Sequence, residues 1–413
     1  MRCTSRRSGR GWPAWVLGTV ARCSDGRCCN DRRRGDDRRR GDDRRRTTLW
    51  TVSTEPSRTA STSLTWPQIL GRVTDGIDLT VDEAAWAMNE IMSDAATGAQ
   101  IAAFGVGVKM KGAAPAELRG LAAAMLDHAT LVDVARPAVD VVGTGGDRSH
   151  TVNISTMTSI VIAAAGIPVV KHGNRAASSK SGGADVLEAL GINISLGAAD
   201  VARCVDELGI GFCFAPVFHP AFRFTGPPRS QIGIPTVFNV LGPLTNPARP
   251  RRGLIGCAFV DLAPVLAQAF ADRGGSVLVV RGDDGLDELT TTTTSTVWQV
   301  VDGEVHRLAL DPADLGIGRV QLSELQGGDA TANATIAREL FAGKGGPVRD
   351  AVLLNAAGAI VAFEQDSAMT TAELTDAMGA AVDRAAAVID SGEATGLLDR
   401  WGRLTTELAA AAD

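Results

Sequence analysis

Long apolar runs are missing from this sequence of 413 residues. The run over residues 160–170 has 11 residues and contains Gly166 and Pro168, whereas a membrane-spanning helix needs ~20 apolar residues. The apolar patch at residues 12–21 is also short, contains Pro13 and has no convincing small-residue cleavage site. We therefore expect neither a membrane helix nor a signal peptide.

Cysteine is scarce and tyrosine is absent. Of the seven cysteines, only Cys204, Cys213 and Cys257 lie beyond the first 60 residues, and each is surrounded by apolar residues. This odd, scattered set has no C-x-x-C spacing, so it predicts neither a disulfide framework nor a zinc site. Buried thiols of this kind are typical of a reducing compartment, and we expect a cytoplasmic location.

Basic residues are few in the main part of the chain. The whole chain has a net charge of −6, but residues 1–60 hold 16 arginines, no lysine and seven acidic residues, so the remainder has a net charge of −15. Nucleic-acid binding draws its affinity from Lys and Arg placed against phosphates. The main part of the chain is therefore not expected to wrap DNA or RNA, although one small anionic ligand is compatible with its charge.

The N-terminal segment, residues 1–62, is dominated by the hexapeptide RRRGDD, which repeats over residues 32–43. A segment with so few apolar residues cannot offset the entropy lost on ordering, and we expect a solvated, disordered tail. A basic arm for nucleic acid is the alternative, although the Asp pairs partly cancel the Arg triplets. Because no Met occurs between Met1 and Met88, a third alternative is translation from a later Val or Leu codon.

Helical and strand-like patterns divide the rest of the chain. Residues 66–128 have a helical pattern, with a capping box from Thr80 to Glu83. From residue 138, short apolar runs alternate with helical patterns, which predicts a mostly parallel sheet with helices on both faces. The expected strands are 138–142, 167–171, 210–215, 253–259 and 276–280, and the expected C-terminal helices are 332–344, 348–365 and 370–411.

The predicted fold class is α/β, with a small all-helical domain and a larger α/β domain around a mostly parallel central sheet. We expect the helical domain at residues 63–135, joined by part of 198–228, and the α/β domain at residues 136–413. Gly105 and Gly107 fall inside an expected helix at 97–110. Each would cost about 1 kcal/mol there unless close helix packing requires it.

The first expected strand runs into a glycine-rich turn, Gly143-Thr144-Gly145-Gly146-Asp147. Glycines at this place let backbone N–H groups approach a phosphate, and the helix expected from about Ser155 adds a positive dipole. The turn has neither the Walker sequence nor G-x-G-x-x-G, so a simple tight connection is the alternative. The next run, TVNIST at 151–156, holds four polar side chains, and N-capping by Ser155 or Thr156 would explain only one of them.

The second expected strand ends in Lys171-His172-Gly173-Asn174-Arg175, and hydroxyls and glycines follow as far as Gly183. Cations, an amide and glycines at a strand end suit a polyanion pocket, because ligands of open α/β sheets gather at the carboxyl ends of the strands. A solvated loop with ordinary surface charges is the alternative reading. Two such loops on successive strands favour the pocket.

An acidic turn, Gly282–Glu288, follows the fifth expected strand. Carboxylates beside a phosphate site favour Mg²⁺, a hard ion that prefers oxygen ligands. In a regular strand the neighbours Asp287 and Glu288 would point to opposite faces, but the nearby Gly285 indicates a turn in which both can converge. A solvated acidic turn is the alternative.

The chain resembles the anthranilate phosphoribosyltransferases over about residues 64–411. The resemblance is carried by the runs GTGGD, TVNIST, KHGNRAASS, FHPAFR, IPTVFNVLGPLTNPA and GDDGLDELT, in this order. It implies a homodimer whose substrates lie at the hinge between the two domains. It also implies that the phosphoribosyl group of 5-phosphoribosyl 1-diphosphate is transferred to the amino group of anthranilate, with release of pyrophosphate, in tryptophan biosynthesis. Mg²⁺ is the implied cofactor, and we expect two ions.

The resemblance also implies roles for individual residues. The sugar diphosphate would be bound by Gly143, Gly146, Asp147, Thr151, Asn153, Ile154, Ser155, Thr156, Lys171, His172, Gly173, Asn174, Arg175, Ala176, Ala177, Ser178, Ser179 and Gly183. Anthranilate would be bound by Gly143, Asn174 and Arg229, and Mg²⁺ by Ser155, Asp287 and Glu288. Three further residues match positions that line the family's entrance for anthranilate: His172, His219 and Arg223.

Three positions depart from the family's pattern. Arg148 replaces a usual Gly, Phe222 replaces a common Tyr, and Pro227-Pro228 precede Arg229. We expect these changes to alter the mobility of the diphosphate loop, to remove a hydroxyl and to stiffen the loop that presents Arg229. None of them is a residue assigned to metal or phosphate.

The implied chemistry needs neither a covalent nucleophile nor a strong base, and we assign none. An aromatic amine is already neutral at pH 7, and breaking the bond from C1 of the ribose to pyrophosphate develops charges that positioned groups can stabilise. Mg²⁺ and Lys171 would stabilise the leaving group. The planar fork of Arg229 suits the carboxylate of anthranilate.

Two other functions are compatible with the fold. A pyrimidine nucleoside phosphorylase would use phosphate and a nucleoside, but the KHGNR run and the acidic pair favour the transferase. A nucleic-acid-binding protein with a repurposed site would be expected to have a basic main part and to lose Asn174 and Arg229. The main part here is acidic, and both residues are present.

Overall fold

The structure is a computed structural model that describes residues 64–175 and 180–412. Residues Thr62–Asp413 form one compact unit. The predicted tail and the predicted ligands Ala176–Ser179 lie outside the described residues. Among the described helices, none is long and apolar enough to cross a membrane. The three cysteines beyond the tail are buried and free, as the sequence predicts.

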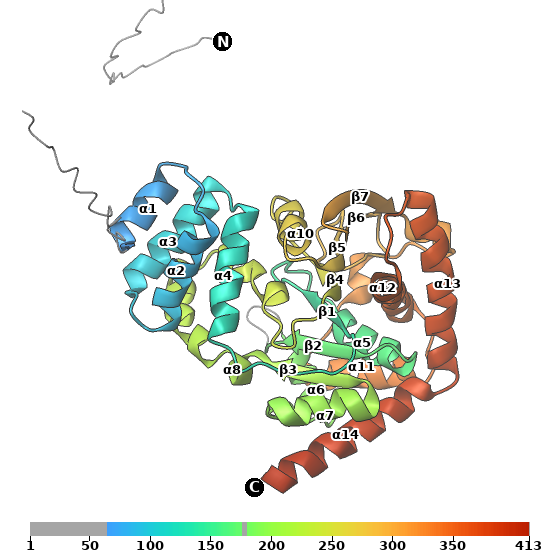
Figure 1. Cartoon of the computed structure of the whole chain (residues 1–413). Coiled ribbons are helices and arrows are strands. Elements are labelled where there is room, and N and C mark those ends of the chain that lie inside the picture. Colours follow the sequence, from blue (N-terminus) through green and yellow to red (C-terminus); the bar gives the residue numbers. More distant parts are fainter. Residues whose placement is uncertain (1–63, 176–179, 413) are drawn as a thin grey trace, which may run out of the picture. The chain divides into compact units, whose positions relative to one another are not determined.

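Four helices open the described chain (Figure 1): α1 (Trp66–Thr74), α2 (Val81–Met92), α3 (Gly98–Lys111) and α4 (Pro115–Asp127). The predicted capping box is confirmed, because Glu83 N donates to Thr80 Oγ1 at 3.2 Å and Thr80 N donates to Glu83 Oε2 at 2.9 Å. Close packing explains Gly107 inside α3, since a Cβ there would lie 2.7 Å from Val73 Cγ1. The helical region predicted from the sequence is thus confirmed.

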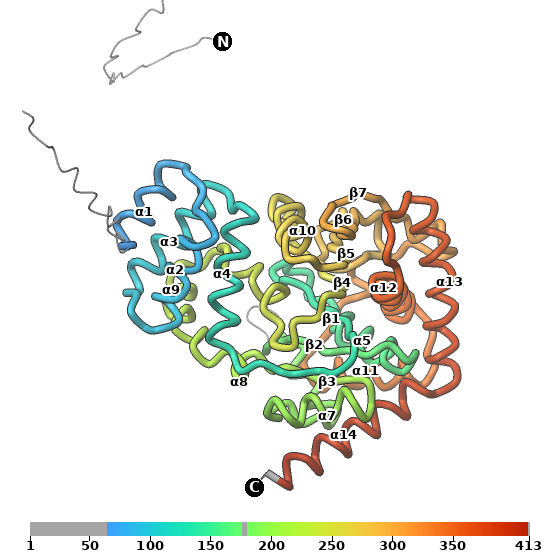
Figure 2. Tube along the Cα trace, in the orientation of Figure 1, coloured from blue at the N-terminus to red at the C-terminus, as the bar shows by residue number. Residues whose placement is uncertain are grey.

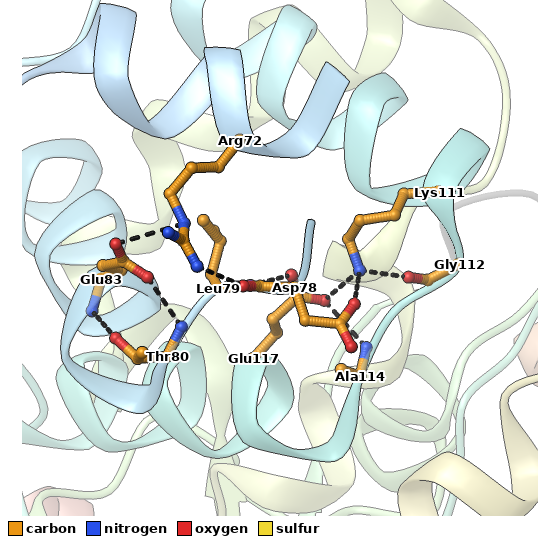
Figure 3. A network of polar contacts seen from close by, with 9 residues as sticks. All are labelled: Arg72, Asp78, Leu79, Thr80, Glu83, Lys111, Gly112, Ala114 and Glu117. Atoms are coloured by element: carbon orange, nitrogen blue, oxygen red, sulfur yellow. Dashed lines mark hydrogen bonds and ion pairs between the residues drawn. The ribbon is translucent and has the colours of Figure 1, made fainter. Parts of the chain in front are cut away.

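A buried ion network joins the ends of these helices (Figure 3). Lys111 Nζ at the end of α3 lies 2.5 Å from Asp78 Oδ1 and 3.1 Å from Glu117 Oε2, although its side chain is only 3% exposed. Glu117 is fully buried and accepts hydrogen bonds from Leu79 N at 3.0 Å and Ala114 N at 2.8 Å. The Glu117 carboxylate therefore accepts hydrogen bonds from backbone N–H groups just before α2 and α4, and it also forms an ion pair with Lys111 at the end of α3.

The central sheet has seven strands in the order β3-β2-β1-β4-β5-β6-β7. The strands are β1 (Val139–Gly143), β2 (Val169–Gly173), β3 (Ile210–Phe214), β4 (Arg252–Gly256), β5 (Ser276–Gly282), β6 (Ser295–Val301) and β7 (Glu304–Leu310). The first five are parallel, so the predicted fold class is confirmed. The sequence analysis missed the antiparallel pair β6–β7 at one edge, which turns on Asp302-Gly303 with φ of 51° and 79°.

Helices cover both faces of this sheet (Figure 1). The helices that follow α4 in the chain are α5 (Ile154–Ala164), α6 (Gly183–Ala189), α7 (Ala198–Leu208), α8 (Ala215–Phe218), α9 (Gly226–Ile232), α10 (Ala263–Ala271), α11 (Ala330–Phe341), α12 (Pro347–Glu364), α13 (Thr371–Asp390) and α14 (Glu393–Ala412), and of these α9 packs on α3 and not on the sheet. Short 3₁₀ turns are η1 (Pro220–Thr225), η2 (Val237–Val240), η3 (Gly242–Leu244), η4 (Pro312–Leu315) and η5 (Leu322–Leu325). The single helix predicted at 370–411 is wrong: Gly392, with φ of 81°, separates α13 from α14.

Two apolar clusters hold the layers together. On one face of the sheet, Leu254 and Val280 belong to the cluster that contains α5, α12 and α13. On the other face, Ile255 and Val279 share a cluster with α10 and with the cores of α1 to α4. The helical region is therefore continuous with one face of the sheet. The segment that follows β3 also returns to this region, where η1 packs on α2 and α9 packs on α3 (Figure 2).

Candidate active site

A cavity of about 790 Å³ lies at the carboxyl ends of β1, β2 and β3. Its walls include the glycine loop after β1, the start of α5, the end of β2, the acidic turn after β5, and α9. Met125 of α4 and Phe238 of η2 add apolar surface. Carboxyl ends of parallel strands meet at one edge of a sheet, which explains why motifs far apart in the sequence face the same cavity.

The glycine loop is shaped around Asp287. A Cβ at Gly143 would lie 2.1 Å from Asp287 Oδ2, and a Cβ at Gly256 would lie 1.6 Å from the carbonyl oxygen of Asp287. Gly145 has φ of 67° and donates its N–H to Asp287 Oδ2 at 2.7 Å. A side chain at Gly143 or Gly256 would clash, and the positive φ of Gly145 favours glycine, so the loop and the acidic turn can approach each other.

Helix α5 points its N-terminus into the cavity. The alternative prediction, that Ser155 or Thr156 is the N-cap of this helix, is wrong. The N-cap is Asn153, whose carbonyl oxygen accepts hydrogen bonds from Thr156 N and Met157 N at 3.1 Å each. The Asn153 side chain is held elsewhere: Nδ2 donates to Ser181 O at 3.2 Å, and Oδ1 accepts from Asn333 Nδ2 at 2.9 Å. The hydroxyl of the first turn that lines the cavity is that of Ser155.

The acidic pair converges on the start of α5. Gly285, with φ of 106°, forms the predicted turn, and Glu288 Oε1 accepts from Ser155 N at 3.1 Å. Burial raises the pKa of Asp287 to about 6 and the pKa of Glu288 well above its usual value, and the nearby Asp147 adds to both shifts. Glu288 Oε2 is buried with no hydrogen-bond partner among the described residues.

This donor set fits a hard cation. Two clustered carboxylates with raised pKa values and an orphaned oxygen need a positive charge, and Ser155 Oγ offers a third oxygen donor close by. The described residues gather no group of three or more His, Cys, Asp and Glu side chains that could enclose a metal. A bound Mg²⁺ would therefore need ligands from substrate or water as well as from the protein.

Lys171 lies at the centre of the polar half of the site. Its Nζ donates to Val141 O at 2.6 Å and to Ser155 Oγ at 3.2 Å, and the residue is 4% exposed. Burial lowers its pKa, while the charges of Asp140, Glu288 and Asp287 oppose this shift. The ammonium is thus placed beside the acidic pair and the N-terminus of α5.

The loop after β2 is divided between the cavity and the surface. Gly173 and Asn174 line the cavity, and a Cβ at Gly173 would lie 2.9 Å from Phe212. Arg175 also borders the cavity, but its guanidinium pairs with Glu188 and with Asp185 Oδ1 at 2.8 Å on α6. In this structure the Arg175 guanidinium is therefore held by two carboxylates of α6.

The other half of the cavity is aromatic and cationic. Arg229 of α9 is half-buried, its Cζ lies 5.4 Å from the centre of the Phe222 ring, and burial lowers its pKa. No described carboxylate lies within ion-pair distance of Arg229. A half-buried guanidinium without a countercharge suits an anionic ligand that brings an aromatic or apolar body.

Two histidines stand between these halves. The rings of His172 and His219 are buried with centroids 5.2 Å apart, and His172 Nδ1 lies 3.1 Å from Gly242 O. Because a carbonyl only accepts, His172 Nδ1 carries the hydrogen and Nε2 is left as an acceptor. Burial and the neighbouring His219 lower the pKa of His172 to about 3, so its ring is neutral and a weak base.

The departures from the family pattern have visible consequences. Arg148, which stands where a glycine is usual, has φ of 60°, a left-handed conformation that costs a side-chain-bearing residue about 1–2 kcal/mol. Pro227 and Pro228 lie in the first turn of α9, where proline fits a helix without loss of hydrogen bonds. The loop that presents Arg229 is thus the start of a helix.

Most of the predicted site residues meet in this one cavity. Those that line it are Gly143, Gly146, Asp147, Thr151, Asn153, Ser155, Lys171, His172, Gly173, Asn174, Arg175, Gly183, Arg229, Asp287 and Glu288. Ile154 and Thr156 are buried behind the wall, where Thr156 Oγ1 would lie 3.1 Å from a Cβ on Gly183. Met125, Phe238 and Asn239 also line the cavity but were not predicted as site residues, although Phe238 and Asn239 lie in the run IPTVFNVLGPLTNPA.

Comparison with known proteins adds independent findings. The model of the helical bundle domain of a glycosyl transferase family matches residues 67–129, and the model of the a/b domain of that family matches residues 135–395. The anthranilate phosphoribosyltransferase of Rhodococcus jostii is 69% identical over 345 residues, which are 84% of this chain and 94% of that protein.

Solved structures agree in fold. The anthranilate phosphoribosyltransferase of Thermus thermophilus has a TM-score of 0.75 and 38% identity, and the match covers 82% of this chain and 99% of that one. The Saccharomyces cerevisiae enzyme in complex with PRPP and Mg has a TM-score of 0.73 and 26% identity, over 83% of this chain and 98% of that one.

Proposed function

This chain belongs to the anthranilate phosphoribosyltransferase family, and we propose how its residues divide the work of that reaction. The protein transfers the phosphoribosyl group of 5-phosphoribosyl 1-diphosphate (PRPP) to the amino group of anthranilate and releases pyrophosphate, in tryptophan biosynthesis, with Mg²⁺. The observation that carries this assignment is the meeting of the glycine loop, Lys171, the acidic pair and Arg229 in one cavity.

The polar half of the cavity binds the sugar diphosphate. Backbone N–H groups of the glycine loop and the N-terminus of α5 attract the phosphates, and Lys171 stabilises the negative charge that builds on the leaving pyrophosphate. Ser155, Asp287 and Glu288 hold Mg²⁺, which neutralises the diphosphate when it is bound. We propose two ions, as the resemblance led us to expect, and the few protein donors beside Glu288 mean that oxygens of the substrate or water would complete the coordination. The other residues assigned to PRPP from the sequence are kept in that role.

The aromatic half of the cavity binds anthranilate. Arg229 pairs with the carboxylate, Asn174 and Gly143 contact the anthranilate beside it, and Phe222 forms an apolar wall. Because the amine is ortho to the carboxylate, binding the carboxylate at Arg229 also fixes the position of the amine. No general base acts on it: His172 is too weak a base, and the ammonium formed by attack on C1 loses its proton to water.

The assembly and the division of the chain complete the proposal. The protein is a cytoplasmic homodimer, with a helical domain at residues 63–135 and an α/β domain at residues 136–413. The packing of η1 on α2 and of α9 on α3 supports including part of 198–228 in the helical domain. The buried free cysteines support a reducing compartment.

A fluorescence assay tests the function. Purified protein is mixed with anthranilate, and the decay of anthranilate fluorescence is followed with PRPP and Mg²⁺ together and with each omitted. We expect decay only when both are present, together with one pyrophosphate released per anthranilate consumed. Decay without PRPP, or no decay with all components and folded protein, would contradict the assignment.

A further inference from the structure

The sheet is split directly beneath the active site. Among the described residues, only the pair Val139–Val169 joins β1 to β2, whereas five pairs join β1 to β4 and five join β2 to β3. At the start of this pairing, Val139 N donates to Pro168 O at 2.8 Å. In a parallel ladder, the next rung would pair Val141 N with Val170 O and His172 N with Val141 O. That rung is missing.

Side chains take over the backbone groups of the missing rung. Val170 O accepts from Asn246 Nδ2 at 2.8 Å, and His172 N donates to Asp140 Oδ1 at 3.2 Å. Val141 O accepts from Lys171 Nζ at 2.6 Å. Three of the four groups that the missing rung would have paired are therefore satisfied by side chains without closing the gap.

Asp140 and Asn246 also bind each other. Asn246 Nδ2 donates to Asp140 Oδ2 at 2.8 Å, although the two residues are 106 positions apart. Both are almost fully buried, at 2% and 3% exposed, and Asn246 Oδ1 accepts from Ala248 N at 2.9 Å. A buried carboxylate and amide with nearly complete hydrogen bonding act as a rigid spacer between the two strands.

The spacer leaves room for the cavity. The residues that line it include Val142 and Gly143 from β1 and Lys171, His172 and Gly173 from β2, so its floor is the split between these strands. Neither Asp140 nor Asn246 lines the cavity. Asn246 binds the carbonyl of Val170 and Asp140 binds the N–H of His172, and these are the two residues on either side of Lys171 in the chain.

We propose that Asp140 and Asn246 are positioning residues, which hold β1 and β2 apart so that Lys171 and the following loop face the diphosphate. This inference rests on the role proposed above for Lys171. It predicts that damage to the spacer impairs pyrophosphate binding beyond any loss of stability. A purely structural pair would change stability alone.

The test uses conservative variants and one matched control. Asp140→Asn keeps the shape but replaces an oxygen acceptor by an NH₂ donor, so the bonds from His172 N and Asn246 Nδ2 can no longer both be accepted. The control is Gln299→Ala on β6, because Gln299 is also buried and makes two similar bonds, to Ser367 O and from Met369 N, at 2.9 Å each. Binding of pyrophosphate with excess Mg²⁺ is measured by calorimetry, beside the melting temperature.

We expect Asp140→Asn to weaken pyrophosphate binding at least tenfold, which is about 1.4 kcal/mol, and to raise the KM for PRPP in parallel. Gln299→Ala should lower the melting temperature but leave both constants within about twofold. If Asp140→Asn yields no folded protein, Asn246→Ser carries the test with the same expectation. Unchanged pyrophosphate binding in a folded spacer variant would overturn the proposal.

A double variant tests the pair itself. Asn246→Asp alone sets two carboxylates against each other, whereas Asp140→Asn with Asn246→Asp restores the bond between the two positions with donor and acceptor exchanged. We expect the double variant to bind pyrophosphate at least threefold more tightly than Asn246→Asp alone. No recovery would contradict the spacer. If the wild-type protein itself fails to bind pyrophosphate or to consume anthranilate, the proposed function fails instead, so the two failures are distinct.

Discussion

Replacing the acidic pair should make the metal-free protein more stable while it destroys activity. In the double variant Asp287→Asn/Glu288→Gln, the oxygens that accept from Gly145 N and Ser155 N are retained, so the turn keeps its two backbone bonds. The double variant removes the unfavourable free energy of holding two carboxylates close together in the partly buried cavity wall.

The magnitude follows from the pKa of Asp287, which is raised from 3.8 to about 6. The shift already includes the attraction of Lys171, and at 1.36 kcal/mol for each unit it corresponds to about 3 kcal/mol. A raised carboxyl pKa disfavours the folded, ionised form above pH 6, and the penalty fades as pH falls through 6 toward 3.8. Asp287 alone thus contributes about 3 kcal/mol to the gain at pH 8 and about half as much at pH 5, and Glu288, whose pKa is also raised, adds to the gain of the double variant.

The assay is thermal unfolding in chelator, repeated with Mg²⁺ and pyrophosphate. For the described part of the chain, about 3 kcal/mol is a rise in melting temperature of about 4 °C at pH 8. Mg²⁺ with pyrophosphate should raise the melting temperature of wild type and not that of the variant, and turnover should fall by about a hundredfold or more. Added Mg²⁺ should rescue turnover only partly.

The control removes two charges from the same turn but outside the cavity. Asp283 and Asp284 are exposed, and their carboxylates accept hydrogen bonds from threonine hydroxyls. Thr294 Oγ1 donates to Asp283, and Thr290 Oγ1 donates to Asp284. Asp283→Asn/Asp284→Asn should show neither the rise at pH 8 nor the loss of the Mg²⁺ effect. If the variant at Asp287 and Glu288 is less stable than wild type at pH 8, or turns over normally at low Mg²⁺, the reasoning about this pair is wrong.

Four further predictions concern other parts of the molecule. Arg229→Ala should raise the KM for anthranilate at least tenfold, about 1.4 kcal/mol, and leave the KM for PRPP nearly unchanged; equal effects on both would refute a dedicated anthranilate ligand. His172 should give the NMR signal of a neutral imidazole from pH 8 down to pH 5. Because its pKa is lowered in the folded protein, His172 should lower the stability of the fold increasingly below pH 6.5, where the unfolded chain takes up the proton. An imidazole NMR signal that titrates near pH 6.5 would refute its burial. Lys111→Met should cost about 3 kcal/mol in chemical denaturation, because it leaves Glu117 buried and unpaired, whereas Arg203→Met at the exposed pair with Glu207 should cost less than about 1 kcal/mol. Deleting residues 1–60 should leave activity within about twofold and the melting temperature unchanged, and a large loss of either would show that this segment docks.

The parts of the fold that local patterns determine were predictable. Five apolar runs separated by helical patterns identified the parallel strands, and Thr80 with Glu83 identified the start of α2. The β6–β7 hairpin was not predicted, although Asp302-Gly303 is a strong hairpin turn. Its two antiparallel strands follow each other directly and so fall outside the alternation of strand and helix that identified the other five.

The site was predictable to the extent that strand ends meet at one edge of a sheet. Lys171, Ser155 and Asp287 come from three separate motifs and lie in one cavity for this reason. The pairing of Arg175 with α6 was not predictable, because it depends on where Asp185 and Glu188 of a later helix come to lie.

The spacer beneath the site has no local signal at all. Asp140 reads as an ordinary polar residue in an apolar strand, and Asn246 as part of a turn beside Pro247. Only the three-dimensional arrangement shows that one supports the other across the split between β1 and β2. Such long-range polar pairs are invisible to periodicity, which describes one element at a time.

The most direct test of the proposed division of the cavity is a crystal structure with Mn²⁺ and PRPP, in which anomalous scattering locates the metal. We expect anomalous peaks within coordination distance of Asp287, Glu288 and Ser155, with the diphosphate between them and Lys171 and with the half of the cavity around Arg229 free for anthranilate. Peaks away from the acidic pair, or a diphosphate bound to Arg229, would contradict the account.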